Sequence, residues 1–154
     1  MEKIYEFLKN CETYYLATSD SGQPRVRPFG TIDLFEGKLY IQTGKVKEVS
    51  RQMKADPRIE ICGMDGGRWI RVTAKAVLDE RVEAQKHMLD AYPSLQKMYQ
   101  PGDGNTEVFR LEEGTARICS FTDPEEIITF RKNRKICGSE AVSERTGGQI
   151  TWHW

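Results

Sequence analysis

The stretch LYIQTGKVKEVSRQMKADPRIEIC, residues 39–62, sets the pattern around which the rest of the chain is arranged. Its first three residues are apolar and favour a half-buried strand. Gly44 ends this strand, because glycine tolerates backbone angles that other residues avoid. Arg58 to Cys62 alternates polar and apolar residues, which predicts a second strand.

Between these strands the sequence predicts a helix that begins at Val46. Val46, Val49 and Met53 recur at spacings of three and four, so they share one face. Basic residues occupy another face of the same helix: Lys47, Arg51 and Lys54. Asp56 ends the helix, because a residue that precedes proline is disfavoured in the helical conformation.

The turn before this helix has the chemistry of a phosphate site. The first N–H groups of a helix lack partners inside it and attract anions. Thr43 adds a hydroxyl, and Lys45 and Lys47 add positive charge. The alternative is a surface helix whose basic face is solvated, which is the more common use of such a charge pattern.

The composition excludes several classes of protein. The 154 residues favour one domain with one core. Basic and acidic residues are equal at 23 each, so no net charge points to nucleic acid or to an anionic membrane. Mean hydropathy is −0.61, and no apolar run approaches the roughly 18 residues of a membrane span. The N-terminal residues lack the apolar segment of a signal peptide, so we expect a cytoplasmic protein.

The cysteines do not form a metal-binding pattern. None of Cys11, Cys62, Cys119 and Cys137 belongs to a C-x-x-C pair, and the two histidines are far apart in the sequence. We therefore expect reduced thiols and no metal site. Cys62 lies in an apolar strand pattern, which predicts a position in the core.

The first third of the chain favours a small antiparallel barrel. Residues 4–11 have the spacing of a short amphipathic helix. Residues 13–18, 23–29 and 31–35 are typical of strands joined by tight turns. Prolines at positions 24 and 28 place the second of these strands at a sheet edge.

The remainder adds strands and one more helix. Residues 69–78 alternate cleanly, and residues 80–91 predict a helix. Residues 107–111 and 115–121 are predicted as the last two strands, divided by a turn at Glu113. The composition changes after residue 130, so we predict a domain at 1–130 and a tail of unknown role at 131–154. The predicted fold class is α+β with a β-barrel core.

Several segments, in this order, resemble a known family: RVRPF (25–29), QTGK (42–45), a helix closing on Asp-Pro, IEIC (59–62) and WIRVTAKA (69–76). They are similar to the pyridoxamine 5'-phosphate oxidase-like FMN-binding split barrels. Within that superfamily the nitroimidazole-resistance-like group looks nearest. The resemblance implies a homodimer of antiparallel split β-barrels, each of about six strands with peripheral helices, and FMN at the interface.

The resemblance also implies where FMN lies. The strand 25–29 runs along the flavin, and the segment 43–47 holds its phosphate. The cofactor-binding residues expected on this basis are Arg25, Val26, Arg27, Pro28, Phe29, Gln42, Thr43, Gly44, Lys45, Lys47 and Trp69. Arg25 and Arg27 share one strand face, so at least one is expected to reach the cofactor; the alternative is that both lie on a solvated sheet edge. Phe29, Gln42, Trp69 and Tyr99 are candidates for the substrate side, and for Trp69 and Tyr99 core packing is the alternative.

Two departures narrow the expected chemistry. Pyridoxamine-phosphate oxidases carry an Arg-x-His pattern for the substrate phosphate, whereas the matching VFRLEEG (108–114) has no histidine. Some nitroimidazole-resistance members place a histidine beside the flavin where this chain has Gln42. Activities that need that imidazole, haem ligation included, are therefore not expected. His87, in the helix predicted at 80–91, is expected at the surface or at the core boundary.

The sequence thus predicts an FMN-dependent oxidoreductase acting on a small organic acceptor, nitroreductase-like or pyridoxamine-phosphate-oxidase-like, with a nicotinamide as a candidate electron donor. It names no catalytic residue. The alternative is a flavin-binding carrier or sensor without turnover. Binding of nucleic acid through the basic residues of 45–54 and 131–135 is disfavoured by the zero net charge.

Overall fold

The predicted strands pair into one antiparallel sheet, which the computed structural model describes over residues 1–131. The eight strands follow the order β2-β1-β5-β6-β7-β4-β3, and β8 pairs with β7. The elements in chain order are α1 (Glu2–Cys11), β1 (Tyr14–Asp20), β2 (Gln23–Phe29), β3 (Asp33–Phe35), β4 (Lys38–Gly44), α2 (Glu48–Ala55), β5 (Arg58–Asp65), β6 (Arg68–Asp79), α3 (Val82–Ala91), the 3-10 helix η1 (Pro93–Lys97), β7 (Thr106–Ser120) and β8 (Glu126–Phe130). The predicted α+β class is confirmed, and the tail predicted at 131–154 lies outside the described residues except for residue 131.

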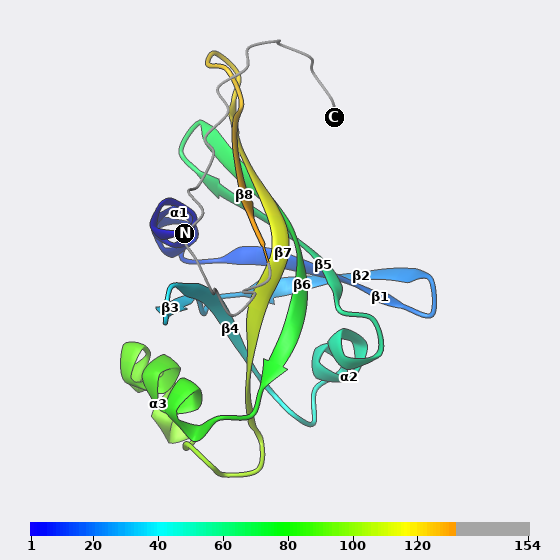
Figure 1. Cartoon of the computed structure of the whole chain (residues 1–154), viewed down its shortest axis with the longest axis vertical. Coiled ribbons are helices and arrows are strands. Elements are labelled where there is room, and N and C mark those ends of the chain that lie inside the picture. Colours follow the sequence, from blue (N-terminus) through cyan, green and yellow to red (C-terminus); the bar gives the residue numbers. More distant parts are fainter. Residues whose placement is uncertain (132–154) are drawn as a thin grey trace, which may run out of the picture.

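The sheet is strongly curved around a main apolar core, and a smaller apolar cluster lies between β4, β7 and α3. The long strands β5, β6 and β7 run together, and the β1–β2 hairpin crosses them (Figure 1). Alternate residues of the strands point inward, so Leu16, Ile61, Ile70 and Val72 are fully buried. The prediction that β2 is an edge strand is confirmed, because β2 pairs with β1 alone.

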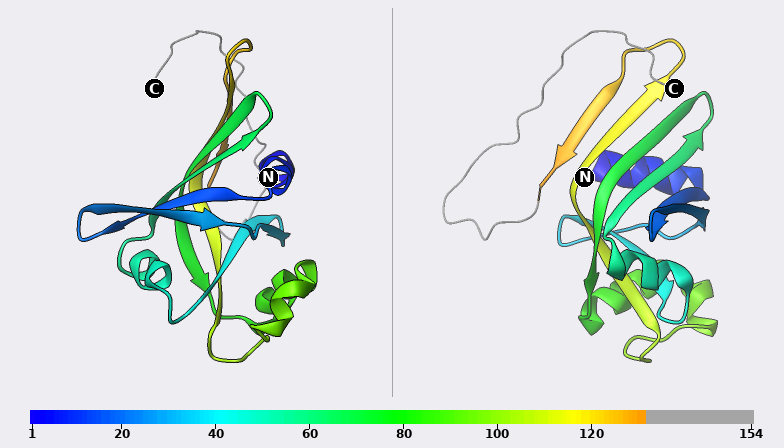
Figure 2. Two further views of the ribbon diagram at one scale, coloured as in Figure 1. Left: turned by 180° about the vertical axis from the view of Figure 1, so that it is seen from behind. Right: turned by 90° about the vertical axis from the view of Figure 1, so that its right-hand side faces the viewer.

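The helices cover the core at two places. Ile4, Phe7 and Leu8 of α1 are buried, as their spacing predicts. Figure 2 shows α1 beside the upper half of the long strands, whereas α2 and α3 lie near their lower ends. No helix in the part of the chain that the structure describes is long and apolar enough to cross a membrane.

The start of α2 corrects a prediction. The helix begins at Glu48, with Lys47 as its N-cap residue, rather than at Val46. Val46 lies in the preceding turn and is 86% exposed, so the apolar face consists of Val49 and Met53 without it. Val46 matches the helical spacing of Val49 and Met53 by chance, so the apolar periodicity predicted a helix that begins two residues too early.

The predicted break at Glu113 is also wrong. β7 is one strand of 15 residues, and Glu113 adopts a φ of 49° within it. The pairing with β6 shifts here: Thr73 faces Thr115, whereas Lys75 faces Glu112. One extra residue on β7 therefore makes a β-bulge, a feature that uses the same left-handed backbone as a turn but continues the strand. The next strand is β8, which the sequence analysis did not predict.

Cys62 corrects a third prediction. It is exposed on β5, whereas its neighbours Ile61 and Gly63 are buried. The strand alternates as predicted, but Ile59 and Ile61 occupy the inward positions and so direct Cys62 outward.

A buried carboxylate at the end of β6 anchors the start of α3. Asp79 accepts hydrogen bonds from Tyr40 Oη at 2.9 Å and from Arg81 Nη2 at 2.8 Å. Burial on its own raises the pKa of Asp79, but the bonds from Arg81 and Tyr40 outweigh it and hold that pKa at about 2.

On α3 itself, His87 is exposed and its Nδ1 lies 2.6 Å from the buried carboxylate of Asp33. This confirms the expected boundary position of His87.

Candidate functional site around the start of helix α2

The edge strand β2 divides its predicted cofactor residues between two faces. Val26 and Pro28 are exposed and point away from α2, and Val26 is 68% exposed. Arg25, Arg27 and Phe29 point to the other face, since successive side chains of a strand alternate. Phe29 packs against the core, with its ring 6.1 Å from that of Tyr14. One face of β2 therefore contacts α2 and the core. The other face is exposed to solvent in the described part of the chain.

Arg27 is held against α2 by neutral groups. Its Nη1 donates to Thr18 Oγ1 at 2.8 Å and to the Leu16 carbonyl oxygen at 3.2 Å. Its Nη2 donates to Gln52 Oε1 at 2.6 Å. Burial lowers the pKa of Arg27, and the positive charge of Arg25 lowers it further. An arginine keeps its proton despite such effects, so this partly buried group is a cation.

Arg25, on the same face, is placed differently. Its Nε lies 3.7 Å from Asp20 Oδ2, and its side chain is more than half exposed. Of the two arginines expected on one face, only Arg27 reaches the α2 helix through hydrogen bonds.

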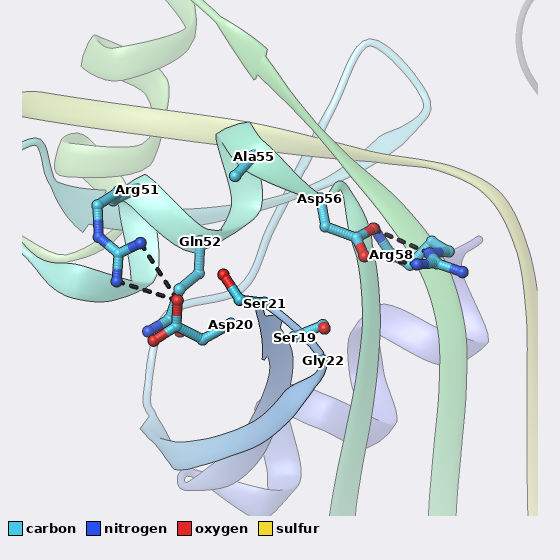
Figure 3. A pocket seen from close by; sticks show the side chains of 9 residues that line it. All are labelled: Ser19, Asp20, Ser21, Gly22, Arg51, Gln52, Ala55, Asp56 and Arg58. Atoms are coloured by element: carbon cyan, nitrogen blue, oxygen red, sulfur yellow. Dashed lines mark hydrogen bonds and ion pairs between the residues drawn. The ribbon is translucent and has the colours of Figure 1, made fainter.

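A hollow lies beside this network, between the β1–β2 turn and the second half of α2 (Figure 3). It measures about 330 Å³, and Gln52 contributes to its wall. Its charged groups are already paired: Arg51 with Asp20 at 3.2 Å and Arg58 with Asp56 at 2.6 Å. Each cation in the wall thus has its own carboxylate, and the hollow does not favour an anion.

The turn between β4 and α2 uses much of its backbone internally. The Lys45 N–H donates to the Asn105 carbonyl oxygen at 2.7 Å, and the Val46 N–H donates to Asn105 Oδ1 at 3.4 Å. The Lys47 N–H donates to the Gly44 carbonyl oxygen at 3.0 Å. These three N–H groups therefore have protein partners, and the cations of the turn reside in the side chains of Lys45 and Lys47. Both side chains are exposed.

The predicted residues of β4 are enclosed. Gln42 is only 7% exposed, and its Nε2 donates to the Thr43 carbonyl oxygen at 3.2 Å. Thr43 is buried as well. Tyr99 is also buried and packs on Gly44, where an added Cβ would meet the Tyr99 hydroxyl at 3.0 Å. Tyr99 thus supports the turn from the inside.

Trp69 lies far from the turn in the same chain. Gln42 faces Val108 of β7, and Trp69 faces Cys119 of the same strand. These positions differ by 119 − 108 = 11 residues, or roughly 35 Å of strand. The β5–β6 turn next to Trp69 lies in the upper half of Figure 1, whereas α2 lies in the lower half. The structure brings Arg27 close to the start of α2 but does not bring Trp69 there.

Three cations without an acidic partner lie along α2: Lys45 and Lys47 directly precede Glu48, and Arg27 contacts Gln52. Among residues 1–131, Arg27, Lys45 and Lys47 make no ion pair, whereas most other arginines do. Gln52 lies one helical turn after Glu48, so Arg27 meets the helix one turn from its start. A partly buried cation that lacks a counter-ion has the chemistry of an anion site.

Two members of this site, Thr18 and Gln52, were not predicted from the sequence. The available signal was a glutamine on the apolar face of a helix, since Gln52 lies between Val49 and Met53 and is buried with them. In the described part of the chain no group of three or more His, Cys, Asp or Glu side chains could hold a metal ion.

Comparison with known proteins agrees with this architecture. The model of the family described as pyridoxamine 5'-phosphate oxidase matches residues 1–120. The chain belongs to this family. A solved structure of a NimC/NimA family protein from Clostridium acetobutylicum is 43% identical, with a TM-score of 0.81, and the match covers 84% of this chain and 93% of that one. The predicted resemblance and the split-barrel fold are confirmed. No curated protein matches.

Solved structures with lower sequence identity share the fold. A pyridoxamine 5'-phosphate oxidase-related, FMN-binding protein from Nostoc punctiforme is 18% identical, with a TM-score of 0.61 over 86% of this chain and 90% of that one. A haem-binding protein from Mycobacterium smegmatis is 19% identical, with a TM-score of 0.57 over 79% and 57%. The two carry different cofactors on the same fold, so the fold alone does not select between them.

Proposed function

We propose that the protein binds FMN and acts as an FMN-dependent oxidoreductase on a small organic acceptor. The observation that carries this proposal is the set of cations without an acidic partner along α2: Lys45 and Lys47 before its first turn, and Arg27 at Gln52. An FMN phosphate has nearly two negative charges, and cations that offer N–H donors bind such a group well. Family membership and the FMN-binding relative support the same cofactor.

The residues of this chain have separate tasks in that proposal. Arg27 donates from a fixed position, whereas the exposed Lys45 and Lys47 attract the phosphate and neutralise its charge. Bound FMN supplies the electron-transfer chemistry, and the protein supplies binding and electrostatics. Gln42 offers an amide, which can form hydrogen bonds but cannot exchange a proton near neutral pH. This favours FMN over haem, because an amide is a poor substitute for an imidazole ligand.

We also propose that two copies associate through the outer face of the sheet. On this face Tyr15 is 53% exposed, Val26 is 68% exposed and Met64 is 61% exposed. Tyr15 lies between Pro28 and the exposed Cys62 in one row of the sheet. An apolar patch of this kind on an otherwise charged surface is typical of an interface. Because Trp69 is far from the turn in its own chain, it contacts the cofactor only if a second copy supplies it.

The homodimer is tested by sedimentation of the wild type and of Met64→Lys. We expect a dimeric wild type and a largely monomeric variant. Met98→Lys is the matched control, because Met98 is 68% exposed but lies after η1, away from this face. A monomeric wild type with flavin fully bound contradicts the proposal.

The cofactor and the activity are tested in sequence. The flavin-free protein is titrated with FMN, and flavin fluorescence gives the affinity and stoichiometry. The loaded protein is then mixed rapidly, without oxygen, with NADH or NADPH, and afterwards with a nitroaromatic compound or a quinone. We expect reduction by at least one donor and reoxidation by at least one acceptor. Tight FMN binding without either step supports the carrier or sensor function, and no FMN binding refutes the proposal as a whole.

A further inference from the structure

The neutral side chain of Gln52 is the feature of the α2 site that the proposed function does not yet use. Gln52 is only 3% exposed, yet no acidic residue accompanies it against Arg27. Its Oε1 accepts two hydrogen bonds, one from Thr18 Oγ1 and one from Arg27 Nη2, both at 2.6 Å. Two bonds use the full accepting capacity of an amide oxygen.

The direction of every bond in this cluster is fixed. Thr18 gives its only hydroxyl hydrogen to Gln52, so toward Arg27 it can only accept. Both hydrogens of Arg27 Nη1 are used, by Thr18 and by the Leu16 carbonyl oxygen. One hydrogen of Nη2 is used by Gln52. The guanidinium has no freedom to rotate without breaking these bonds.

The hydrogens that remain form a second edge. A guanidinium has five N–H groups, so the Nε hydrogen and one hydrogen of Nη2 have no partner among residues 1–131. Thr18 Oγ1 and Gln52 Oε1 lie 2.6 Å apart and therefore meet the two Nη atoms side by side. The free hydrogens consequently belong to the edge formed by Nε and Nη2. Two parallel N–H groups on one edge match two oxygens of a phosphate.

We infer that Gln52 is a positioning residue that presents the free edge of Arg27 to the phosphate of the cofactor while leaving the positive charge of Arg27 uncompensated. This inference rests on the proposed function. A glutamate at this position would hold Arg27 equally well but would neutralise it, and a guanidinium already paired with a carboxylate attracts a phosphate less. The amide thus separates two tasks, orientation and charge, that an acidic residue would combine.

The test is Gln52→Glu, which keeps the shape of the side chain and adds one negative charge. We expect FMN affinity to fall on the order of tenfold or more and riboflavin affinity to stay within twofold, since riboflavin lacks the phosphate. The melting temperature should not fall, because the new carboxylate pairs with Arg27. The matched control is Ala55→Glu, which adds the same charge to an exposed position of α2 that makes no hydrogen bond with Arg27, and its FMN affinity should stay within threefold of wild type.

The outcomes separate this inference from the proposed function. If wild type binds FMN and Gln52→Glu binds it equally well, the inference is overturned and the flavin function stands. If wild type binds neither flavin, the flavin function fails, and the anion site is tested with inorganic phosphate by following the ¹⁵N–¹H signal of Arg27 Nε. A saturable shift in wild type that is lost in Gln52→Glu then supports the inference, and an unchanged signal in wild type refutes it.

Discussion

Replacing Arg27 by alanine tests the anion site most directly. The structure leaves two N–H groups of Arg27 without partners in residues 1–131. A hydrogen bond between charged groups contributes about 1.5–3 kcal/mol. Because the site is partly exposed, we take the low end, and two bonds then give about 3 kcal/mol. Arg27→Ala should therefore weaken FMN binding about a hundredfold.

The assay is a fluorescence titration with FMN and, in parallel, with riboflavin. The loss should be specific to FMN, and Arg27→Lys should recover only part of it, because an ammonium keeps the charge but lacks the fork of donors. Arg25→Ala is the matched control: it lies on the same strand face but is half exposed and close to Asp20. Melting curves check that each variant is folded. An equal loss of FMN and riboflavin affinity, or an equal effect of Arg25→Ala, would refute the reasoning.

Three further predictions concern the turn, the core and the flavin face. Gly44→Ala should cost about 1–2 kcal/mol of stability and weaken FMN binding, because its Cβ meets the Tyr99 hydroxyl at 3.0 Å; urea melts should show part of the loss restored in the double variant with Tyr99→Phe. Asp79 has a folded-state pKa of about 2 against an ordinary value of 3.8, so above pH 4 it contributes roughly 2.5 kcal/mol to the free energy of unfolding. This contribution is lost as the pH falls from about 4 to about 2. Urea melts at pH 6, 4 and 2.5 should show that Asp79→Asn loses less stability in acid than wild type, and equal losses would contradict this. Gln42→His should change the pH dependence of turnover without abolishing FMN binding. Rapid mixing over pH 5–8 measures the rates of flavin reduction and reoxidation, and an unchanged dependence of these rates on pH would show that position 42 takes no part in proton transfer.

The sequence was a reliable guide to elements whose pattern is local. The prolines of β2 predicted an edge strand rather than a central one. The alternation of polar and apolar residues in β6 predicted a strand, as observed. The prediction failed where the same residue pattern is typical of two different backbone structures, a hairpin turn and a β-bulge. A glutamate followed by glycine is typical of a hairpin turn, and only the pairing of Thr73 and Lys75 with β7 reveals a bulge at Glu113.

The site shows the same limit. A basic strand and a basic turn are visible in the sequence, so Arg27, Lys45 and Lys47 could be named. The neutral partners of Arg27 could not, because Thr18 and Gln52 are 34 positions apart and meet only in the folded chain. Trp69 was expected near FMN from resemblance alone, and the length of β7 separates it from the turn within one chain.

The position of β4 in the sheet has a consequence for how the chain folds during its synthesis. β4 has two partners: β3, which precedes it directly, and the first residues of β7, where Gly44 pairs with Thr106. All residues of β4 after Lys38 are buried, so until Thr106 to Arg110 leave the ribosome this apolar strand has an open edge. Such an edge pairs readily with other chains, and closing a connection of this length is slow. The edge of β4 therefore stays open over the interval in which α2, β5, β6 and α3 are made.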